Sequence, residues 1–81
     1  QAPAIKLFRM QTVVEVFKTT VPSKKEATTI IEHLQSQLRG ARINFDLDDR
    51  DRILRLEGKD FSAEKVMLLV KEKGYWCDVL Q

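Results

Sequence analysis

The sequence has few of the residues that disulfide frameworks, membrane spans and phosphate-binding loops require. Its 81 residues include one cysteine, two prolines and three glycines. A single cysteine cannot form a disulfide within the chain and favours a reducing compartment. No apolar run approaches the roughly 20 residues of a transmembrane helix, and the scattered glycines form no phosphate-binding loop. We therefore expect a cytoplasmic domain that does not associate with membranes.

The chain also lacks a strong excess of charge of either sign. It carries 14 basic and 12 acidic residues, which leaves a net charge of +2. This balance argues against a nucleic-acid or membrane-surface partner. Hydrophobic residues at 43% and charged residues at 32% are ordinary for a globular domain. A chain of this size buries roughly 60% of its unfolded surface, which allows one modest core.

The sequence divides into an N-terminal arm and one domain. Residues 1–10, QAPAIKLFRM, contain a proline and show only weak alternation, so we predict an arm there. Regular hydrophobic patterning begins just afterwards and continues to the end. We predict a single domain over residues 11–81.

Hydrophobic periodicity predicts six elements in that domain. Alternating or β-branched segments predict strands over 12–19, 41–48, 52–58 and 75–80. Apolar residues at helical spacing predict helices over 23–39 and 63–73, the second with Ser62 as its N-cap. The order strand, helix, strand, strand, helix, strand is the ferredoxin-like βαββαβ pattern. Because crossovers are right-handed, we expect an α+β fold with both helices on one face of a four-stranded antiparallel sheet.

Residues 12–80 resemble the heavy-metal-associated domain, the fold of small copper chaperones and of the N-terminal modules of metal-transporting ATPases. The second half, INFDLDDRDRILRLEGKDFSAEKVMLLVKEKGYWCDVL, carries most of the resemblance. Glu57-Gly58 before the second helix and Gly74-Tyr75 after it stand where that family has the same pairs. The resemblance implies a ferredoxin-like fold for this chain.

The metal motif of that family is missing. The family carries Met-x-Cys-x-x-Cys after its first strand. Alignment on the helix residues Ile30 and Leu34 puts Val21 at the Met position and Ser23 and Glu26 at the two Cys positions. A hydroxyl and a carboxylate cannot replace thiolates for Cu(I). We therefore expect no metal site and no cofactor.

Ser23 and Glu26 have a structural interpretation instead. The pattern Ser-x-x-Glu before an apolar helix is a capping box. It predicts that the Ser23 hydroxyl accepts a hydrogen bond from the Glu26 backbone N–H. The Glu26 side chain would in turn accept one from the Ser23 N–H. The competing hypothesis is residual binding of a harder metal ion through Glu26.

Other reactive residues have structural explanations. Cys77 alternates with Tyr75 and Val79, which predicts a buried thiol. His33 lies off the apolar stripe of the first helix, and its neighbours one turn away are Thr29 and Gln37, so we expect a solvated side chain. No motif brings a nucleophile and a base together, and we expect no enzymatic activity.

The acidic hairpin residues do not match a calcium loop. They are Asp46, Asp48, Asp49 and Asp51. In the EF-hand register that begins at Asp46, Arg50 takes the fifth position and Asp51 takes the place of the glycine. We predict a solvated turn.

RNA binding is a further alternative, since RNA-recognition domains share the βαββαβ order. They stack bases on aromatic side chains of the first and third strands. The third strand here has no aromatic residue, and the first has only Phe17, which fits the core equally well. We therefore expect no nucleic-acid partner.

The face of the sheet away from the helices is the remaining candidate. If Phe17 points to the helices, alternation places an apolar patch with a basic border on the opposite face. The predicted patch comprises Val14, Val16, Ile53, Arg55 and Trp76. We expect a protein partner or a homodimer, formed through this face or through a strand edge. Two alternatives remain open, namely cover by the N-terminal arm and a merely scattered set of apolar residues.

Overall fold

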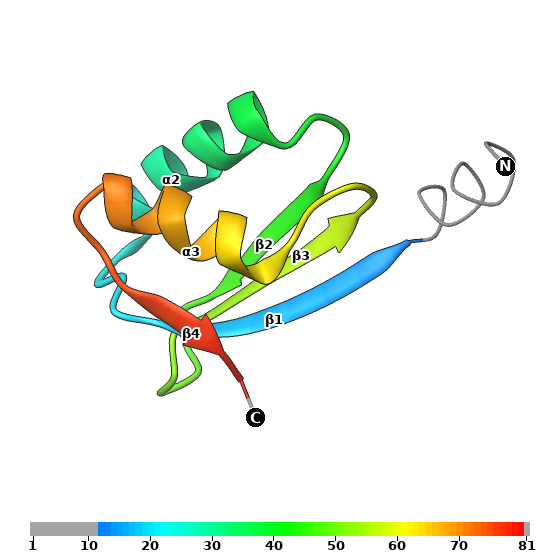
Figure 1. Cartoon of the computed structure of the whole chain (residues 1–81). Helices are drawn as coiled ribbons and strands as arrows, with labels where there is room; N and C mark the ends of the chain where they lie inside the picture. The colour runs from blue at the N-terminus through cyan, green and yellow to red at the C-terminus, as the bar shows by residue number, and fades with distance from the viewer. Residues whose placement is uncertain (1–11, 81) are drawn as a thin grey trace, which may run out of the picture.

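The computed structural model describes residues 12–80 and contains six elements in the predicted order (Figure 1). The strands are β1 (Val13–Thr19), β2 (Arg42–Asp46), β3 (Ile53–Gly58) and β4 (Cys77–Val79). The helices are α2 (Lys24–Gln37) and α3 (Ala63–Glu72). Each observed element lies inside the predicted range, because chain ends near turns leave the regular hydrogen-bond pattern first. The predicted arm, residues 1–10, lies outside the described residues.

The four strands form one antiparallel sheet in the order β2-β3-β1-β4. Strands β1 and β3 are central, and β2 and β4 are the edges. Both helices cover the same face of the sheet (Figure 1). The predicted ferredoxin-like α+β fold is therefore confirmed.

The core lies between this face and the two helices. Alternation places Leu54 and Leu56 of β3 inward and fully buried, while Arg55 between them is exposed. On β1, where both faces are apolar, Phe17 is fully buried and Val14 is 46% exposed. The buried helix residues are Ala27, Ile30 and Leu34 of α2 and Val66, Leu69 and Val70 of α3.

Helix α3 begins at the predicted cap. The Ser62 hydroxyl accepts a hydrogen bond from the Lys65 backbone N–H at 3.2 Å, which satisfies one of the free donors of the first turn. Phe61, just before the cap, is partly buried against the core, and Val66 is fully buried. Gly74 follows the helix with a φ of +91°, a conformation that favours glycine.

A buried threonine fastens the β2–β3 hairpin to the end of β1. The Thr19 hydroxyl donates to the Arg52 carbonyl at 2.7 Å and accepts from the Val21 backbone N–H at 3.1 Å. Arg52 has a φ of +51°, and its guanidinium donates to the Pro22 carbonyl at 2.9 Å. These bonds hold a left-handed non-glycine residue in place. They fix the β1–α2 loop relative to the hairpin.

The core packing predicts a large loss of stability for Leu34→Ala. Leu34 is fully buried, so its truncation leaves a cavity and should lower the free energy of unfolding by about 2–5 kcal/mol. The matched control is Leu68→Ala on α3, where the leucine is 51% exposed and the loss should stay below about 1 kcal/mol. Urea unfolding followed by circular dichroism measures both. Equal losses would contradict the assigned core.

Candidate interaction surfaces

The face of the sheet opposite the helices carries most of the predicted patch. Alternation puts Val14 and Val16 of β1 on this face, and the register sets Val16 directly opposite Arg55 of β3. Ile53 lies two residues before Arg55 and therefore shares its face. No helix within residues 12–80 covers these side chains (Figure 1). We call this surface the open face.

Leu80 also belongs to the open face, although the sequence pattern was not used to predict it there. Its backbone N–H donates to the Val16 carbonyl at 2.8 Å, which sets it beside Val16 just beyond the end of β4. Its side chain is 40% exposed. Alternation from the buried Cys77 could have found it, because residues 78 and 80 must face away from the core.

Charged side chains border these apolar residues. The Arg55 guanidinium lies 3.5 Å from the Glu57 carboxylate on the same strand, and both side chains are solvent-accessible. Across the sheet, Glu57 is opposite both Val14 and Arg42, and Lys18 is opposite Asp78. The open face therefore combines a small apolar centre with charges of both signs.

Trp76 lies at one end of this surface. It precedes β4, where its backbone carbonyl accepts from the Thr20 N–H and its own N–H donates to the Thr20 hydroxyl, both at 3.0 Å. The cross-strand pair of Lys18 and Asp78 separates it from the Val16 row. Its ring is 52% exposed. The structure thus brings four patch residues together and sets Trp76 apart from them.

The Trp76 ring lines a hollow in the surface of the protein. This hollow of about 570 Å³ lies beside α3 and the start of β4. Its lining includes Trp76, Met67, Leu68 and Lys71. Leu68 is 51% exposed, so apolar surface continues from the end of the sheet onto α3.

At the start of α2, the hydrogen bonds of the predicted capping box are not formed. Ser23 takes the N-cap position with extended backbone angles, but its side chain caps no backbone N–H. Instead the Ser23 hydroxyl donates to the Glu26 carboxylate. A hydroxyl bound to a carboxylate forms a charge-assisted hydrogen bond, which is stronger than a neutral one. This bond, followed by a bond to its own backbone N–H and by the charge of Lys25, lowers the pKa of Glu26.

His33 has a partner that the sequence did not reveal. Its Nε2 lies 3.0 Å from the Glu72 carboxylate, which links α2 to α3. The His33 side chain is only 20% exposed. The prediction of a solvated histidine is therefore wrong, because Glu72 is distant in sequence and is brought close by helix packing. Across residues 12–80, no three side chains of His, Cys, Asp or Glu gather as metal ligands would.

Cys77 lies in the core, as predicted. Its side chain is 4% exposed. Burial, with a smaller contribution from the Asp78 carboxylate, raises the pKa of the Cys77 thiol to about 12. The thiol is therefore neutral in ordinary buffers and weakly nucleophilic.

The acidic hairpin forms a hydrogen-bonded turn. The Asp49 carboxylate accepts from the Asp51 backbone N–H at 2.9 Å, and the Asp49 carbonyl accepts from the Arg52 N–H at 2.9 Å. Asp46 belongs to β2 and is exposed. The turn thus uses Asp49 as a structural acceptor.

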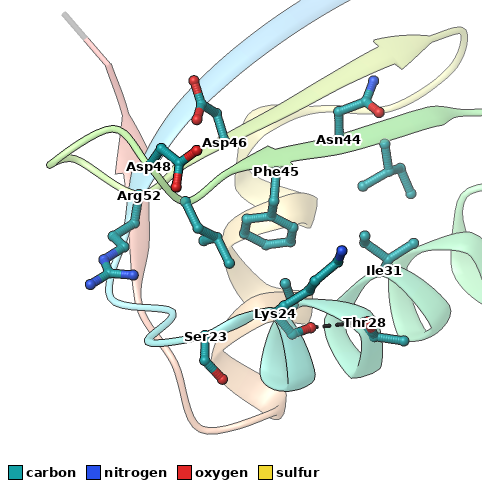
Figure 2. Close-up of a pocket in the computed structure, with 12 residues that line it drawn as sticks. Ser23, Lys24, Thr28, Ile31, Asn44, Phe45, Asp46, Asp48 and Arg52 are labelled. Atoms are coloured by element: carbon teal, nitrogen blue, oxygen red, sulfur yellow. Dashed lines mark hydrogen bonds between the residues drawn. The ribbon is translucent and has the colours of Figure 1, made fainter.

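A groove of about 630 Å³ runs between α2 and the edge strand β2 (Figure 2). Figure 2 shows Phe45 pointing from β2 toward α2, with Lys24 and Ile31 across the hollow. Apolar residues form much of the lining, and Asp46, Asp48, Lys24 and Arg52 border it. The hollow adjoins an edge strand, whose outer backbone groups have no neighbouring strand among the described residues.

Comparison with known proteins identifies no family for this chain. No protein-family model and no curated protein sequence matches this chain. A solved structure, the C-terminal segment of the α subunit of aIF2 from Pyrococcus abyssi, is similar with a TM-score of 0.45 and 20% sequence identity. The match covers 88% of this chain and 49% of that one, so the chain spans about half of that structure's length. Neither helix in residues 12–80 could cross a lipid bilayer.

The bond between Ser23 and Glu26 predicts a measurable pKa change. In Ser23→Ala the Glu26 pKa should rise toward its ordinary value, because the largest cause of its lowering is removed. A lowered folded-state pKa contributes stability above the unfolded-state pKa, and that stability is lost as the pH falls through the folded value. The variant should therefore be less stable than the wild type at neutral pH, and this difference should disappear as the pH falls below the Glu26 pKa.

Carboxyl-carbon NMR titration of Glu26 measures the change directly. Ser36→Ala is the matched control, because the Ser36 hydroxyl donates to the His33 carbonyl in the same helix and not to Glu26. An unchanged Glu26 pKa in Ser23→Ala would show that this hydroxyl does not bind the carboxylate in solution.

The burial of Cys77 predicts that its thiol reacts slowly in the folded protein. In the native protein at about pH 8, a disulfide reagent should react with Cys77 at least about a hundredfold more slowly than in urea-unfolded protein, because burial suppresses both access and thiolate formation. Because the folded pKa is raised, stability should fall as the pH rises above the unfolded thiol's pKa. Rapid stoichiometric labelling of the folded protein would contradict the buried assignment.

Proposed function

We propose that this chain is a non-catalytic protein-interaction domain whose open face is covered by a protein partner or by a second copy of the chain. The observation that carries the proposal is the composition of that face. Val14 and Leu80 are 46% and 40% exposed, and both lie in the neighbourhood of Val16. An apolar centre with a charged border is the usual composition of a protein interface.

The resemblance to heavy-metal-associated domains enters this proposal through the fold and not through metal. The positions aligned with the family's two cysteines hold Ser23 and Glu26, which bind each other. A hydroxyl and one exposed carboxylate are a poor donor set for Cu(I) or Zn(II). We infer a domain related to that family in architecture that has no part in metal transfer.

The reactive side chains also favour a non-catalytic function. Cys77 is a buried neutral thiol with a pKa raised to about 12, whereas catalytic thiols have lowered values. His33 is engaged with Glu72 between two helices. Phe17, the aromatic residue that base stacking on β1 would need, is fully buried on the helix side, which also disfavours RNA binding.

Site-specific photo-cross-linking in living cells tests the proposal. A photoreactive phenylalanine analogue at position 14 should form an adduct with a defined protein, or with a second copy of the chain, because Val14 is an exposed apolar residue of the open face. The same analogue at Glu32, an exposed position on α2, is the matched control. Mass spectrometry identifies the adduct.

A second substitution separates a specific adduct from chance collision. Leu80→Asp introduces a charge near position 14 on the open face and should reduce the adduct at least about tenfold, since a buried unpaired charge is strongly unfavourable. Absence of any adduct at position 14 would exclude the open face as an interface. Equal adducts at positions 14 and 32 would do the same.

A further inference from the structure

The edge strand β2 offers a regular backbone for pairing with a further strand. Its register with β3 runs without interruption from Arg42↔Glu57 to Asp46↔Ile53, so the strand contains no bulge. Its five residues, RINFD, include no proline or lysine. Edge strands commonly carry such features to prevent pairing with another chain. A regular strand without them is suited to receive a further strand.

The sequence of β2 is complementary to itself in the antiparallel direction. When two copies are paired with Asn44 opposite Asn44, Arg42 of each copy stands opposite Asp46 of the other. Ile43 of each copy then stands opposite Phe45 of the other. Opposite charges and apolar–aromatic pairs both stabilise antiparallel strands. We propose that two copies of this chain associate through β2 in this register.

The charges of the sheet favour this register over its neighbours. Within its own sheet, Asp46 faces Ile53 and has no ion pair among residues 12–80. Arg42 faces Glu57, so a second copy would extend an alternating row of Glu57, Arg42 and Asp46. A shift by two residues in either direction pairs Asn44 with a charged residue and shortens the overlap. The centred register alone uses all five residues.

The groove beside β2 has room for side chains of an added strand. A strand added at this edge places its own Ile43 and Phe45 on the helix side of the sheet, toward the groove lined by Ala27 and Ile31 of α2 (Figure 2). The groove of about 630 Å³ is open along β2. The pairing joins the two four-stranded sheets into one continuous sheet.

The other edge strand of the sheet, β4, is not suited to pairing with a second copy of itself. Strand β4 has three residues, Cys77–Val79, with Asp78 at its centre. Centred self-pairing of β4 sets two Asp78 carboxylates opposite each other, which is unfavourable. The inference is separate from the proposed function, because it uses the edge of the sheet and leaves the open face free.

Charge exchange tests the pairing. Sedimentation velocity from about 10 µM to about 1 mM should show a wild-type dimer of modest affinity, since a single short strand pair buries little area. Arg42→Asp and Asp46→Arg should each weaken dimerisation at least about tenfold, because each places like charges opposite each other at both ends of the pair. The double variant R42D/D46R should dimerise more tightly than either single variant, because opposite charges again face each other at both ends of the pair, although position 42 then lies opposite Glu57 of its own sheet.

An equimolar mixture of the two single variants gives the decisive measurement. It should form a heterodimer, because the chain with Arg42→Asp then presents acidic side chains at positions 42 and 46 to two arginines of the other chain. Lys65→Asp, the same kind of charge change at an exposed site on α3, is the control and should leave the dimer unchanged. Circular dichroism establishes that each variant is folded.

Three outcomes would overturn the inference. They are a wild-type monomer at about 1 mM, a dimer that resists both single variants, and a mixture of the single variants that stays monomeric. The Leu80→Asp variant separates the two proposals, since it should leave the β2 dimer intact. If the β2 variants have no effect while position 14 still forms its adduct, only the pairing is wrong and the open-face proposal stands.

Discussion

The central position of β1 in the sheet is the constraint on which the rest of the structure depends. This strand pairs with β3 on one side and with β4 on the other, and it is apolar on both faces. Phe17 and Val13 share the helix side, so alternation places the other two valines of the strand, Val14 and Val16, on the open face. The surface that we propose for interaction is therefore a consequence of how the core is built.

The same arrangement leaves β2 and β4 as edges of very different character. Strand β2 is regular, longer, and flanked by a groove against α2, whereas β4 is short and carries an acidic residue at its centre. Helix α2 is positioned over β2 by the loop that Thr19, Pro22 and Arg52 hold to the hairpin. These hydrogen bonds lie at the end of the groove that Arg52 borders, and they fix where α2 begins relative to β2.

Some local features were predictable because their causes lie within a few residues. The Ser62 cap, the buried Cys77 and the alternation of β3 follow from short-range patterns, and all three are present. The Ser23-x-x-Glu26 pattern was found, but its hydrogen bond differs from the predicted one. One sequence pattern is compatible with either arrangement, and the choice depends on side-chain rotation at a solvent-exposed position.

The sequence by itself determined the order of elements, the fold and the division of each strand into two faces, because period-2 and helical patterns depend on neighbours along the chain. Tertiary structure alone decided which distant residues meet. It paired His33 with Glu72, placed Leu80 beside Val16, and separated Trp76 from the other patch residues. These contacts depend on the register between strands and the packing of two helices. Neither is encoded in any single local stretch of residues.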